Sequence, residues 1–252
     1  MTFDDLGSRL TRQPSAVRRV VSLVPSLTEA LASVDRGALV GVTDWCTHPA
    51  DLDVTRIRGT KNPDTRAIAA LAPDLVIANK EENRELDVRR LRDAGVDVWV
   101  TDIETVPQSI ASMERLFDEA LGWDRPAWLG TARELWCGEP LAARARVAVP
   151  IWRDPWMVVG RDTFTGDLLA RAGLPNVFAD HAERYPALDL EAIDSVGADA
   201  VLLPDEPYVF TADDGPEAFT RTPTELVEGR LITWYGPSLI EAHEVLQSLL
   251  PR

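Results

Sequence analysis

The sequence predicts an α/β protein with two Rossmann-like lobes, each a parallel sheet with flanking helices, joined by a helical backbone. Two observations carry this prediction. Short Val-rich runs alternate with amphipathic runs over the first 120 residues, and the same alternation restarts after a helix-prone stretch over 125–145 that Gly138 and Pro140 interrupt. Such βαβα alternation is typical of a parallel sheet with helices on both faces.

The elements of the first half follow from local signals. Ser26 with Glu29 three residues later has the pattern of a capping box, Asp64 opens a second helix, and Gly95 ends a third. Pro25 ends the first apolar run. These signals predict strands over 18–24, 38–43, 74–78 and 96–101, and helices over 26–34, 64–72, 82–95 and 106–122.

The second half repeats the pattern after the helix-prone stretch. Asp189 opens a short helix there, and an Asp-Ala-Val-Leu-Leu-Pro run reads as a buried strand. We expect strands over 146–152, 156–160, 199–204 and 230–234, and helices over 165–173, 189–197 and 237–250. The predicted domains are an N-terminal α/β lobe over 18–122, a helical connector over 123–146 and a C-terminal α/β lobe over 147–252.

Composition limits the kinds of partner. The 252 residues carry a net charge of −15, which argues against nucleic acid or an anionic membrane surface. The opening "MTFDDLGSRLTRQPSAVRRV" has two early aspartates and neither an apolar stretch nor a lipobox-like cysteine, so it reads as an unstructured lead rather than a signal peptide. With only two cysteines, the sequence as written predicts a cytoplasmic location, with an extracytoplasmic one as the alternative.

The run "LVIANKEENR" changes abruptly from apolar to charged. In a parallel sheet, ligands gather at the carboxyl ends of the strands, where this change falls. Lys80, Glu81, Glu82 and Asn83 are therefore predicted to line the rim of a cleft between the lobes. The alternative is that these residues only cap and solvate the start of the helix over 82–95.

Five segments together resemble a known family. They are "RVVSLVPSLTEAL", "GVTDWCTHP", "GTKNPD", "APDLVIANKEENR" and "WYGPS". At these spacings they are similar to the helical-backbone (class III) periplasmic-binding-protein family, the substrate-binding proteins of ABC importers for cobalamin, haem and ferric siderophores. The resemblance covers roughly residues 18–250 and is closest to the cobalamin-binding branch. It implies two α/β lobes, a rigid connecting helix and a ligand held between the lobes.

The resemblance also implies site residues. Trp45, Met157, Tyr185 and the Trp234–Tyr235 corner fall at or near ligand-facing positions of the cobalamin-binding branch. Aromatic rings offer large, rigid contact area to a macrocycle at low entropic cost. The alternative for each tryptophan is that it only seals the rim of a sheet. The predicted ligand-binding set is Trp45, Lys80, Glu81, Trp152, Trp156, Met157, Tyr185, Trp234 and Tyr235.

One feature departs from the family. In the cobalamin-binding branch a glutamate on each lobe docks onto arginines of the membrane permease. Glu191 matches on the second lobe, but Arg66 stands at the matching position on the first, with Asp64 two residues away. A like charge would repel an arginine pocket, so permease docking by Glu191 and Arg66 is left open.

Three function classes remain. The first is a non-catalytic protein that binds cobalamin, haem or a ferric siderophore for ABC-type uptake or intracellular handling, with an ABC permease as a further candidate partner. The second is a chelatase-like or hydrolytic enzyme on the same scaffold, although no nucleophile-elbow, Walker or dinucleotide motif occurs. The third is a protein-interaction module without a ligand. No intrinsic cofactor or protein-held metal is expected from three histidines, and His48 is left open as an axial ligand to a corrin or haem metal.

Overall fold

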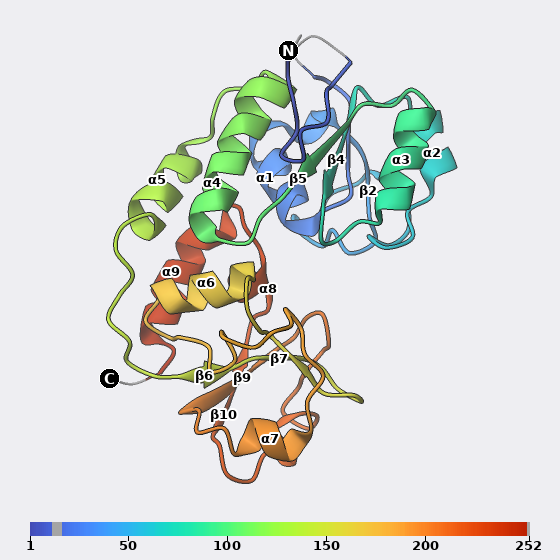
Figure 1. The fold of residues 1–252 in the computed structure, drawn as a ribbon. Coiled ribbons are helices and arrows are strands. Elements are labelled where there is room, and N and C mark those ends of the chain that lie inside the picture. The colour runs from blue at the N-terminus through green and yellow to red at the C-terminus, as the bar shows by residue number, and fades with distance from the viewer. Residues whose placement is uncertain (12–16, 251–252) are drawn as a thin grey trace. The chain divides into compact units, whose positions relative to one another are not determined.

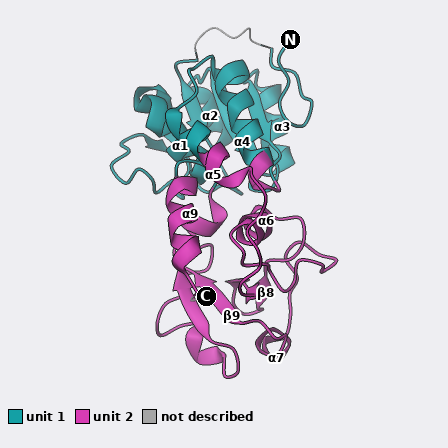
Figure 2. Cartoon of the chain, turned by 90° about the vertical axis from the view of Figure 1, so that its left-hand side faces the viewer, with its two compact units in different colours: residues 1–103, 108–131, 235–237 teal, residues 104–107, 132–234, 238–252 magenta. Residues whose placement is uncertain are grey.

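The computed structural model describes residues 1–11 and 17–250. The chain divides into two compact units, coloured separately in Figure 2. Unit 1 comprises Met1–Ile103, Gln108–Thr131 and Tyr235–Pro237, and unit 2 comprises Glu104–Pro107, Ala132–Trp234 and Ser238–Arg252. Each unit is thus assembled from separate stretches of sequence, and the predicted α/β class with parallel sheets is confirmed.

Unit 1 is built on a five-stranded parallel sheet in the order β3-β2-β1-β4-β5 (Figure 1). Val20 pairs with Leu75, and Ile77 pairs with Trp99, so the β-branched runs of neighbouring strands lie in register. The strands are β1 (Val20–Ser22), β2 (Leu39–Val42), β3 (Thr55–Arg56), β4 (Leu75–Asn79) and β5 (Val98–Thr101).

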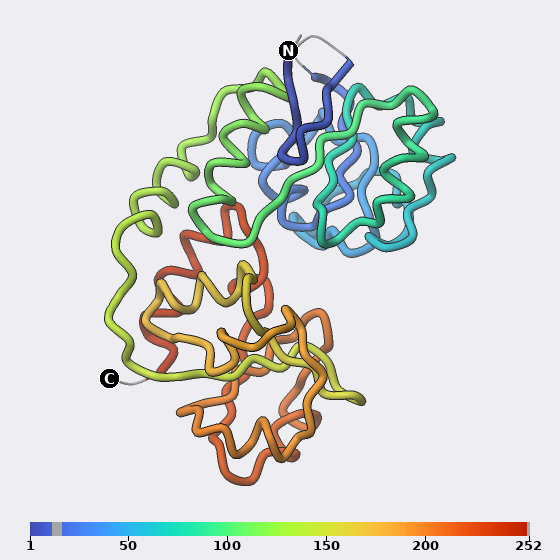
Figure 3. Tube along the Cα trace, viewed as in Figure 1, coloured from blue at the N-terminus to red at the C-terminus, as the bar shows by residue number. Residues whose placement is uncertain are grey.

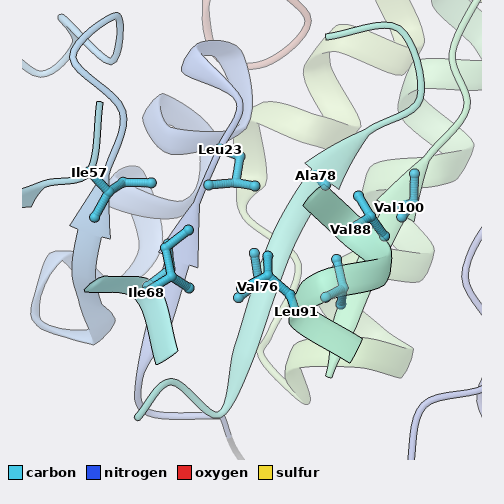
Figure 4. Close-up of a cluster of buried hydrophobic side chains, with 10 residues drawn as sticks. Leu23, Ile57, Ile68, Val76, Ala78, Val88, Leu91 and Val100 are labelled. Atoms are coloured by element: carbon cyan, nitrogen blue, oxygen red, sulfur yellow. The ribbon is translucent and has the colours of Figure 1, made fainter. Parts of the chain in front are cut away.

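Helices cover both faces of this sheet. On one face, Ile68 of α2 and Leu91 of α3 pack against Val76 (Figure 4). On the other face, the Arg115 guanidinium lies 5.2 Å from the ring centre of Trp99. The helices in this part of the chain are α1 (Pro25–Asp35), α2 (Thr65–Ala70), α3 (Glu85–Asp93), α4 (Val106–Arg115), which continues as a π-helical turn over Leu116–Leu121, and α5 (Ala127–Trp136).

Unit 2 holds two smaller sheets. One is parallel in the order β10-β9-β6, and the other is the antiparallel pair β7-β8. Its core joins Val201 and Leu203 of β9 to Trp156 and Phe210. The strands are β6 (Val147–Ala148), β7 (Pro150–Trp152), β8 (Met157–Val158), β9 (Ala200–Pro204) and β10 (Thr224–Val227), and the helices are α6 (Phe164–Arg171), α7 (Leu190–Asp194), α8 (Arg230–Thr233) and α9 (Ser238–Ser248).

Two sequence expectations about elements are wrong. Ser26 is not the N-cap of α1, because the helix begins at Pro25 and the N-cap is Val24 without a side-chain cap. A proline suits the first helical position, since its φ is already fixed there. The run over 230–234 forms the helix α8 rather than a strand, and the strand of this region is β10, in a less apolar segment. In a short apolar run, the periodicity of the sequence does not distinguish a helix from a strand.

The N-terminal residues are folded rather than an unstructured lead. Phe3 and Arg9 form an antiparallel bridge, and Asp4 is buried. The Asp4 carboxylate accepts hydrogen bonds from the backbone N–H groups of Leu6 at 3.1 Å and Ser8 at 2.7 Å, which closes a turn. The expectation for residues 12–16 lies outside the described part of the chain.

Within the described residues, no helix combines the length and the apolar character that a membrane crossing requires.

Candidate functional site

Three loops of unit 1 meet at the carboxyl edge of its sheet. They follow β2, β3 and β4 and cover residues 43–48, 57–62 and 79–83. Parallel strands end on the same edge, so the topology alone brings these loops together. Predicted site residues Trp45, Lys80 and Glu81 therefore belong to one edge.

The loop over 79–83 is organised by two buried asparagines. The Asn79 Oδ1 accepts hydrogen bonds from the backbone N–H groups of Glu81 at 2.8 Å and Glu82 at 3.2 Å. The Asn83 Oδ1 accepts one from the Asn79 N–H at 2.8 Å. Such side-chain-to-backbone bonds fix a turn without a regular ladder.

The same asparagines tie the loop to its neighbours. The Asn83 Nδ2 donates to the carbonyl oxygens of Thr60 at 3.0 Å and Leu23 at 3.4 Å, and the Asn79 Nδ2 donates to the Thr101 Oγ1 at 3.1 Å. Asn83 is therefore a buried organiser and not the rim residue that the sequence predicted. Helix α3 starts only at Glu85, with no side-chain cap, so residues 80–83 precede the helix.

Charged groups of both signs lie on the loop over 79–83 and on the segments next to it. The half-exposed Lys80 Nζ lies 2.8 Å from the Asp102 Oδ2. The Lys61 Nζ donates to the carbonyl oxygen of Glu81. Each lysine is thus held beside an acceptor of this edge, and the Glu81 and Glu82 side chains add two more carboxylates, both partly exposed.

Tyr235 joins this edge from the far end of the sequence. It lies in Tyr235–Pro237, a segment of unit 1, and its hydroxyl is 3.5 Å from the Glu82 Oε1. Burial raises the pKa of Tyr235 well above its ordinary value, and the negative charge of Glu82 raises it further. The hydroxyl therefore stays protonated at neutral pH. A Cβ added to Gly236 would lie 3.2 Å from the Ser26 carbonyl oxygen, so the segment approaches α1 closely.

Trp45 has the largest exposed fraction of any tryptophan among the described residues, 63%. A Cβ added to Gly59 would lie 3.3 Å from the Trp45 Nε1 and 2.6 Å from the Asn62 Oδ1, so the indole rests on the "GTKNP" loop. Behind it, the Cys46 thiol is buried within 3.0 Å of the Thr28 Oγ1, and burial raises the pKa of this thiol. Cys46 is therefore a neutral packing residue, and Trp45 offers the open ring face.

A second group of aromatic side chains lies in unit 2. We call it the aromatic cluster: Trp152, Trp156, Tyr208, Phe210 and Phe219. The buried Trp156 stacks on Phe210 with centroids 5.8 Å apart and planes at 9°, whereas Trp152 is 44% exposed and meets Tyr208 edge-on at 5.7 Å. The cluster therefore has a sealed interior and one accessible indole.

Arg153 holds the outer side of the aromatic cluster. Its guanidinium lies 5.4 Å from the ring centre of Trp156, and its Nη1 contacts Asp214 and lies 2.6 Å from the Glu217 Oε1. The Tyr208 hydroxyl donates to the Asp214 Oδ2 at 2.6 Å, which raises the pKa of Tyr208. Cation–π attraction and these hydrogen bonds fix the loop that carries Asp214.

The other predicted residues are more dispersed. Met157 lies in β8 and is partly buried. Tyr185 is half-buried, and it follows Arg184, whose carbonyl oxygen accepts a hydrogen bond from the Gly160 N–H. Trp234 is buried at the end of α8. Arg66 is exposed on α2, and Glu191 is exposed on α7 with its carboxylate 3.6 Å from Arg221. Their ligand-binding and docking roles stay predictions.

Sequence reasoning missed the residues that hold these groups in place. Asn79 ends a strand four positions before Asn83, a spacing that allows one amide to bond the backbone of the other. Arg153 stands between two tryptophans in the sequence, which was a usable cation–π signal. No group of three His, Cys, Asp or Glu side chains among the described residues is arranged to hold a metal ion.

No protein-family model matches the chain. Among characterised proteins, it is 27% identical over 204 residues to the vitamin B12-binding protein of Salmonella typhi, which covers 76% of this chain and 75% of the relative. It is 25% identical over 196 residues to the vitamin B12-binding protein of Vibrio parahaemolyticus, covering 74% of this chain and 70% of the relative.

Solved structures share the fold. The periplasmic vitamin B12 binding protein of Vibrio cholerae matches with a TM-score of 0.73 and 18% identity, covering 93% of this chain and 97% of the other. A periplasmic heme binding protein from Pseudomonas aeruginosa matches with a TM-score of 0.77 and 22% identity, covering 92% of each chain. The resemblance and the fold predicted from the sequence are confirmed.

The cytoplasmic location predicted from the sequence is wrong. The structural relatives above are named as periplasmic, so an extracytoplasmic location is the expected one.

Proposed function

We propose that the chain is a substrate-binding protein for a metal chelate or macrocycle of the cobalamin, haem or ferric siderophore class, working with an ABC-type uptake system. The observation that carries this proposal is the similarity, across three quarters of the chain, to proteins named for vitamin B12 binding. The organised edge of unit 1 supports it, because a site that is fixed before binding loses less entropy on binding.

Each unit carries groups that suit a ligand of this class. In unit 1, the open indole of Trp45 meets an apolar face of the ligand, and the partly exposed Glu82 carboxylate, beside the buried Tyr235 hydroxyl, accepts hydrogen bonds from polar substituents. In unit 2, the accessible indole is Trp152. Lys80 and Glu81 give the edge both signs of charge, which suits a ligand with amide groups.

The relatives named above are binding proteins, and we infer that this chain likewise binds its ligand without converting it. The enzyme alternative makes an opposite prediction. After incubation and removal of the protein, a bound ligand returns with its original absorption spectrum, whereas a chelatase or hydrolase leaves a changed one. Recovery of a permanently altered spectrum with a catalytic amount of protein would favour the enzyme.

We propose Glu191 as a permease contact, because its side chain is 82% exposed and its surface pairing with Arg221, at 3.6 Å, can be exchanged for a permease arginine. Arg66 is exposed at the corresponding place in unit 1, where it carries the opposite charge from the family's glutamate. A permease that pairs with this chain would therefore offer an acidic group opposite Arg66. Charge reversal at Arg66 tests this: Arg66→Glu should weaken capture by a permease with an acidic group there, whereas stronger capture would show that the permease pocket is basic.

A tryptophan-fluorescence titration tests the binding function. Cyanocobalamin, haem and a panel of ferric siderophores are added in turn, with correction for inner-filter absorption. We expect saturable quenching by one ligand, and an affinity about tenfold lower in Trp45→Ala, the loss of one buried aromatic contact. Leu86→Ala, an exposed apolar residue on α3 of the same unit, is the matched control.

The titration has two contrary outcomes. If none of the ligands quenches the wild type, the binding function proposed here is wrong for these classes. If a ligand binds but Trp45→Ala and Leu86→Ala behave alike, the function stands and the edge of unit 1 is not where the ligand lies. Repeating the titration with Trp152→Ala tests the contribution of unit 2 in the same way.

A further inference from the structure

The N-terminal residues 2–11 form a strap along the outer edge of β5, visible as the dark-blue start of the tube in Figure 3. Strand β5 is at the end of the five-stranded sheet. An end strand normally leaves a row of backbone N–H and C=O groups without a neighbouring strand. The strap occupies that row.

Backbone groups of β5 and its continuation are paired by the strap. The Asp5 N–H donates to the Val100 carbonyl at 3.1 Å. The Val100 N–H donates to the Asp4 Oδ2 at 3.3 Å, and the Asp102 N–H donates to the Asp5 Oδ2 at 3.2 Å. Two carboxylates thus take the place of the carbonyls that a further strand would supply.

The strap is fastened from both faces of the sheet. The Asp4 carboxylate lies 2.7 Å from Arg92 of α3, and the Asp5 carboxylate lies 2.6 Å from Arg115 of α4. The Asp5 Oδ2 also accepts a hydrogen bond from the Ser112 hydroxyl. The Asp4 side chain is fully buried and the Asp5 side chain is only 11% exposed, while the arginine side chains are 33% and 37% exposed, so the carboxylates are enclosed and the pairs are partly buried.

The strap also reaches the candidate site through two hydrogen-bonded steps. Asp5 holds the backbone N–H of Asp102, and the Asp102 carboxylate lies 2.8 Å from the Lys80 Nζ. The Lys80 N–H in turn donates to the Thr101 carbonyl at 2.9 Å. The position of the Lys80 ammonium therefore depends on where the strap fixes the chain just after β5.

We propose that the strap is a working part of the ligand-contact edge and that Asp5 is a positioning residue that acts through Asp102 on Lys80. Asp5 itself does not touch the ligand. The effect of Asp5 on ligand affinity rests on the proposed function, whereas its effect on the structure around Asp102 does not. The inference is therefore tested by a structural arm and by an affinity arm.

The structural arm uses amide hydrogen exchange on the full chain without ligand. Asp5→Ala removes the acceptor of the Asp102 N–H, and we expect that amide to exchange about tenfold faster, as for the loss of one protected hydrogen bond. Asp5→Asn keeps an acceptor oxygen and is expected to restore part of the protection. The control is Asp97→Ala, because the Asp97 Oδ1 accepts hydrogen bonds from the Thr11 N–H and hydroxyl, at the other end of the strap.

The affinity arm is a double-mutant cycle with the ligand identified by fluorescence titration. Asp5→Ala and Lys80→Ala are each expected to weaken binding about two- to fivefold, the range of one half-exposed charge contact. If Asp5 acts through Lys80, the double variant binds no worse than Lys80→Ala alone. If the strap only stabilised the fold, the fold-losses of affinity of the two single variants would multiply in the double variant.

Unchanged exchange at Asp102 in Asp5→Ala overturns the inference whatever the ligand result. Multiplying losses in the cycle overturn its positioning part. If the wild type binds none of the ligands, the proposed function fails while the exchange result still decides the strap. Should Asp5→Ala fail to fold, the same comparisons are made with Asp5→Val, which also lacks the acceptor but fills more of the side-chain volume.

Discussion

The loop over 79–83 in unit 1 and the aromatic cluster in unit 2 solve the same problem by different means. Each must hold an irregular segment still without a sheet ladder. In unit 1, the amides of Asn79 and Asn83 bond directly to backbone groups. In unit 2, the stacked rings of Trp156 and Phe210 and the Arg153 guanidinium contact one another, and these side-chain contacts fix the backbone that carries them.

The difference teaches what each region tolerates. A buried amide has directional partners, so its removal leaves donors and acceptors unpaired. A ring cluster depends on volume and contact area, so it is damaged by truncation and much less by a change of polarity at its rim. The predictions below test this contrast, beginning with the largest expected effect.

Truncating the interior of the aromatic cluster is expected to be the most damaging change. Trp156→Ala removes a buried ring that stacks on Phe210 and lies under Arg153, and should lower the free energy of unfolding by about 3–5 kcal/mol. Urea denaturation monitored by circular dichroism measures this. Trp152→Ala, the half-exposed neighbour, is the control and should cost about 1 kcal/mol or less. Equal losses would contradict a sealed interior.

In unit 1, the corresponding change is Asn83→Ala. It removes an amide that makes hydrogen bonds to Asn79, Thr60 and Leu23, and should lower the free energy of unfolding by about 2–3 kcal/mol. Asn62→Ala, an exposed amide on the neighbouring loop, should change it by less than about 0.5 kcal/mol. If Asn83→Asp is as stable as the wild type, the donated hydrogen bonds are not what holds the loop.

Unit 2 also contains buried polar side chains that bond backbone groups, and one of them, Asp194, sharpens the comparison through pH. Burial raises the pKa of its carboxyl, but hydrogen bonds from the backbone N–H groups of Thr220, Thr222 and Arg221 outweigh burial and leave the pKa lowered. A lowered folded-state pKa stabilises the fold above the unfolded value of about 3.9, and the stabilisation is lost as pH falls through the folded value.

Asp194→Asn should therefore cost about 1–2 kcal/mol at pH 7, and the difference from the wild type should shrink below about pH 4. Urea denaturation at a series of pH values measures it. Asp154→Asn, whose carboxylate is 89% exposed, should show a much smaller difference at every pH. A constant Asp194→Asn cost from pH 7 to pH 3 would show that the charge is irrelevant.

The smallest expected effect is at the rim of the aromatic cluster. Tyr208→Phe keeps the ring against Phe210 but loses the hydrogen bond to Asp214, and should cost about 0.5–1.5 kcal/mol. An alkaline absorbance titration gives a second readout, because Asp214 raises the pKa of Tyr208. In Asp214→Asn, the transition that Tyr208→Phe removes should move to lower pH. A transition that stays in place would remove Asp214 as the cause.

Much of unit 1 could be predicted because its signals are local. Val-rich runs became the strands, Asp64 caps α2 by accepting from the Ala67 N–H, and Gly95 follows α3 with a positive φ. Unit 2 was harder. Strand β10 places the exposed Glu225 and Leu226 between partly buried positions, so its pattern was weak and tertiary pairing with β9 decided that this segment is a strand.

The side chains at the surface of the candidate site could be predicted, but the residues that hold its loops in place could not. Trp45 and Lys80 fall where strand ends must surface, which topology fixes. Tyr235 at the same edge followed only from the family resemblance, because 153 residues separate it from Glu82. The role of Asn83 depends on carbonyls at Leu23 and Thr60, whose positions no local pattern reveals.

The placement of Tyr235–Pro237 within unit 1 has a consequence for synthesis of the chain. A ribosome makes the five strands of unit 1 first and the whole of unit 2 up to Trp234 before it adds the tripeptide that packs beside Glu82 and Ser26. Domains generally fold as units in the order of their synthesis. Unit 1 is therefore the first to start folding, and it gains the buried Tyr235 side chain only after the segments of unit 2 up to Trp234 have been made.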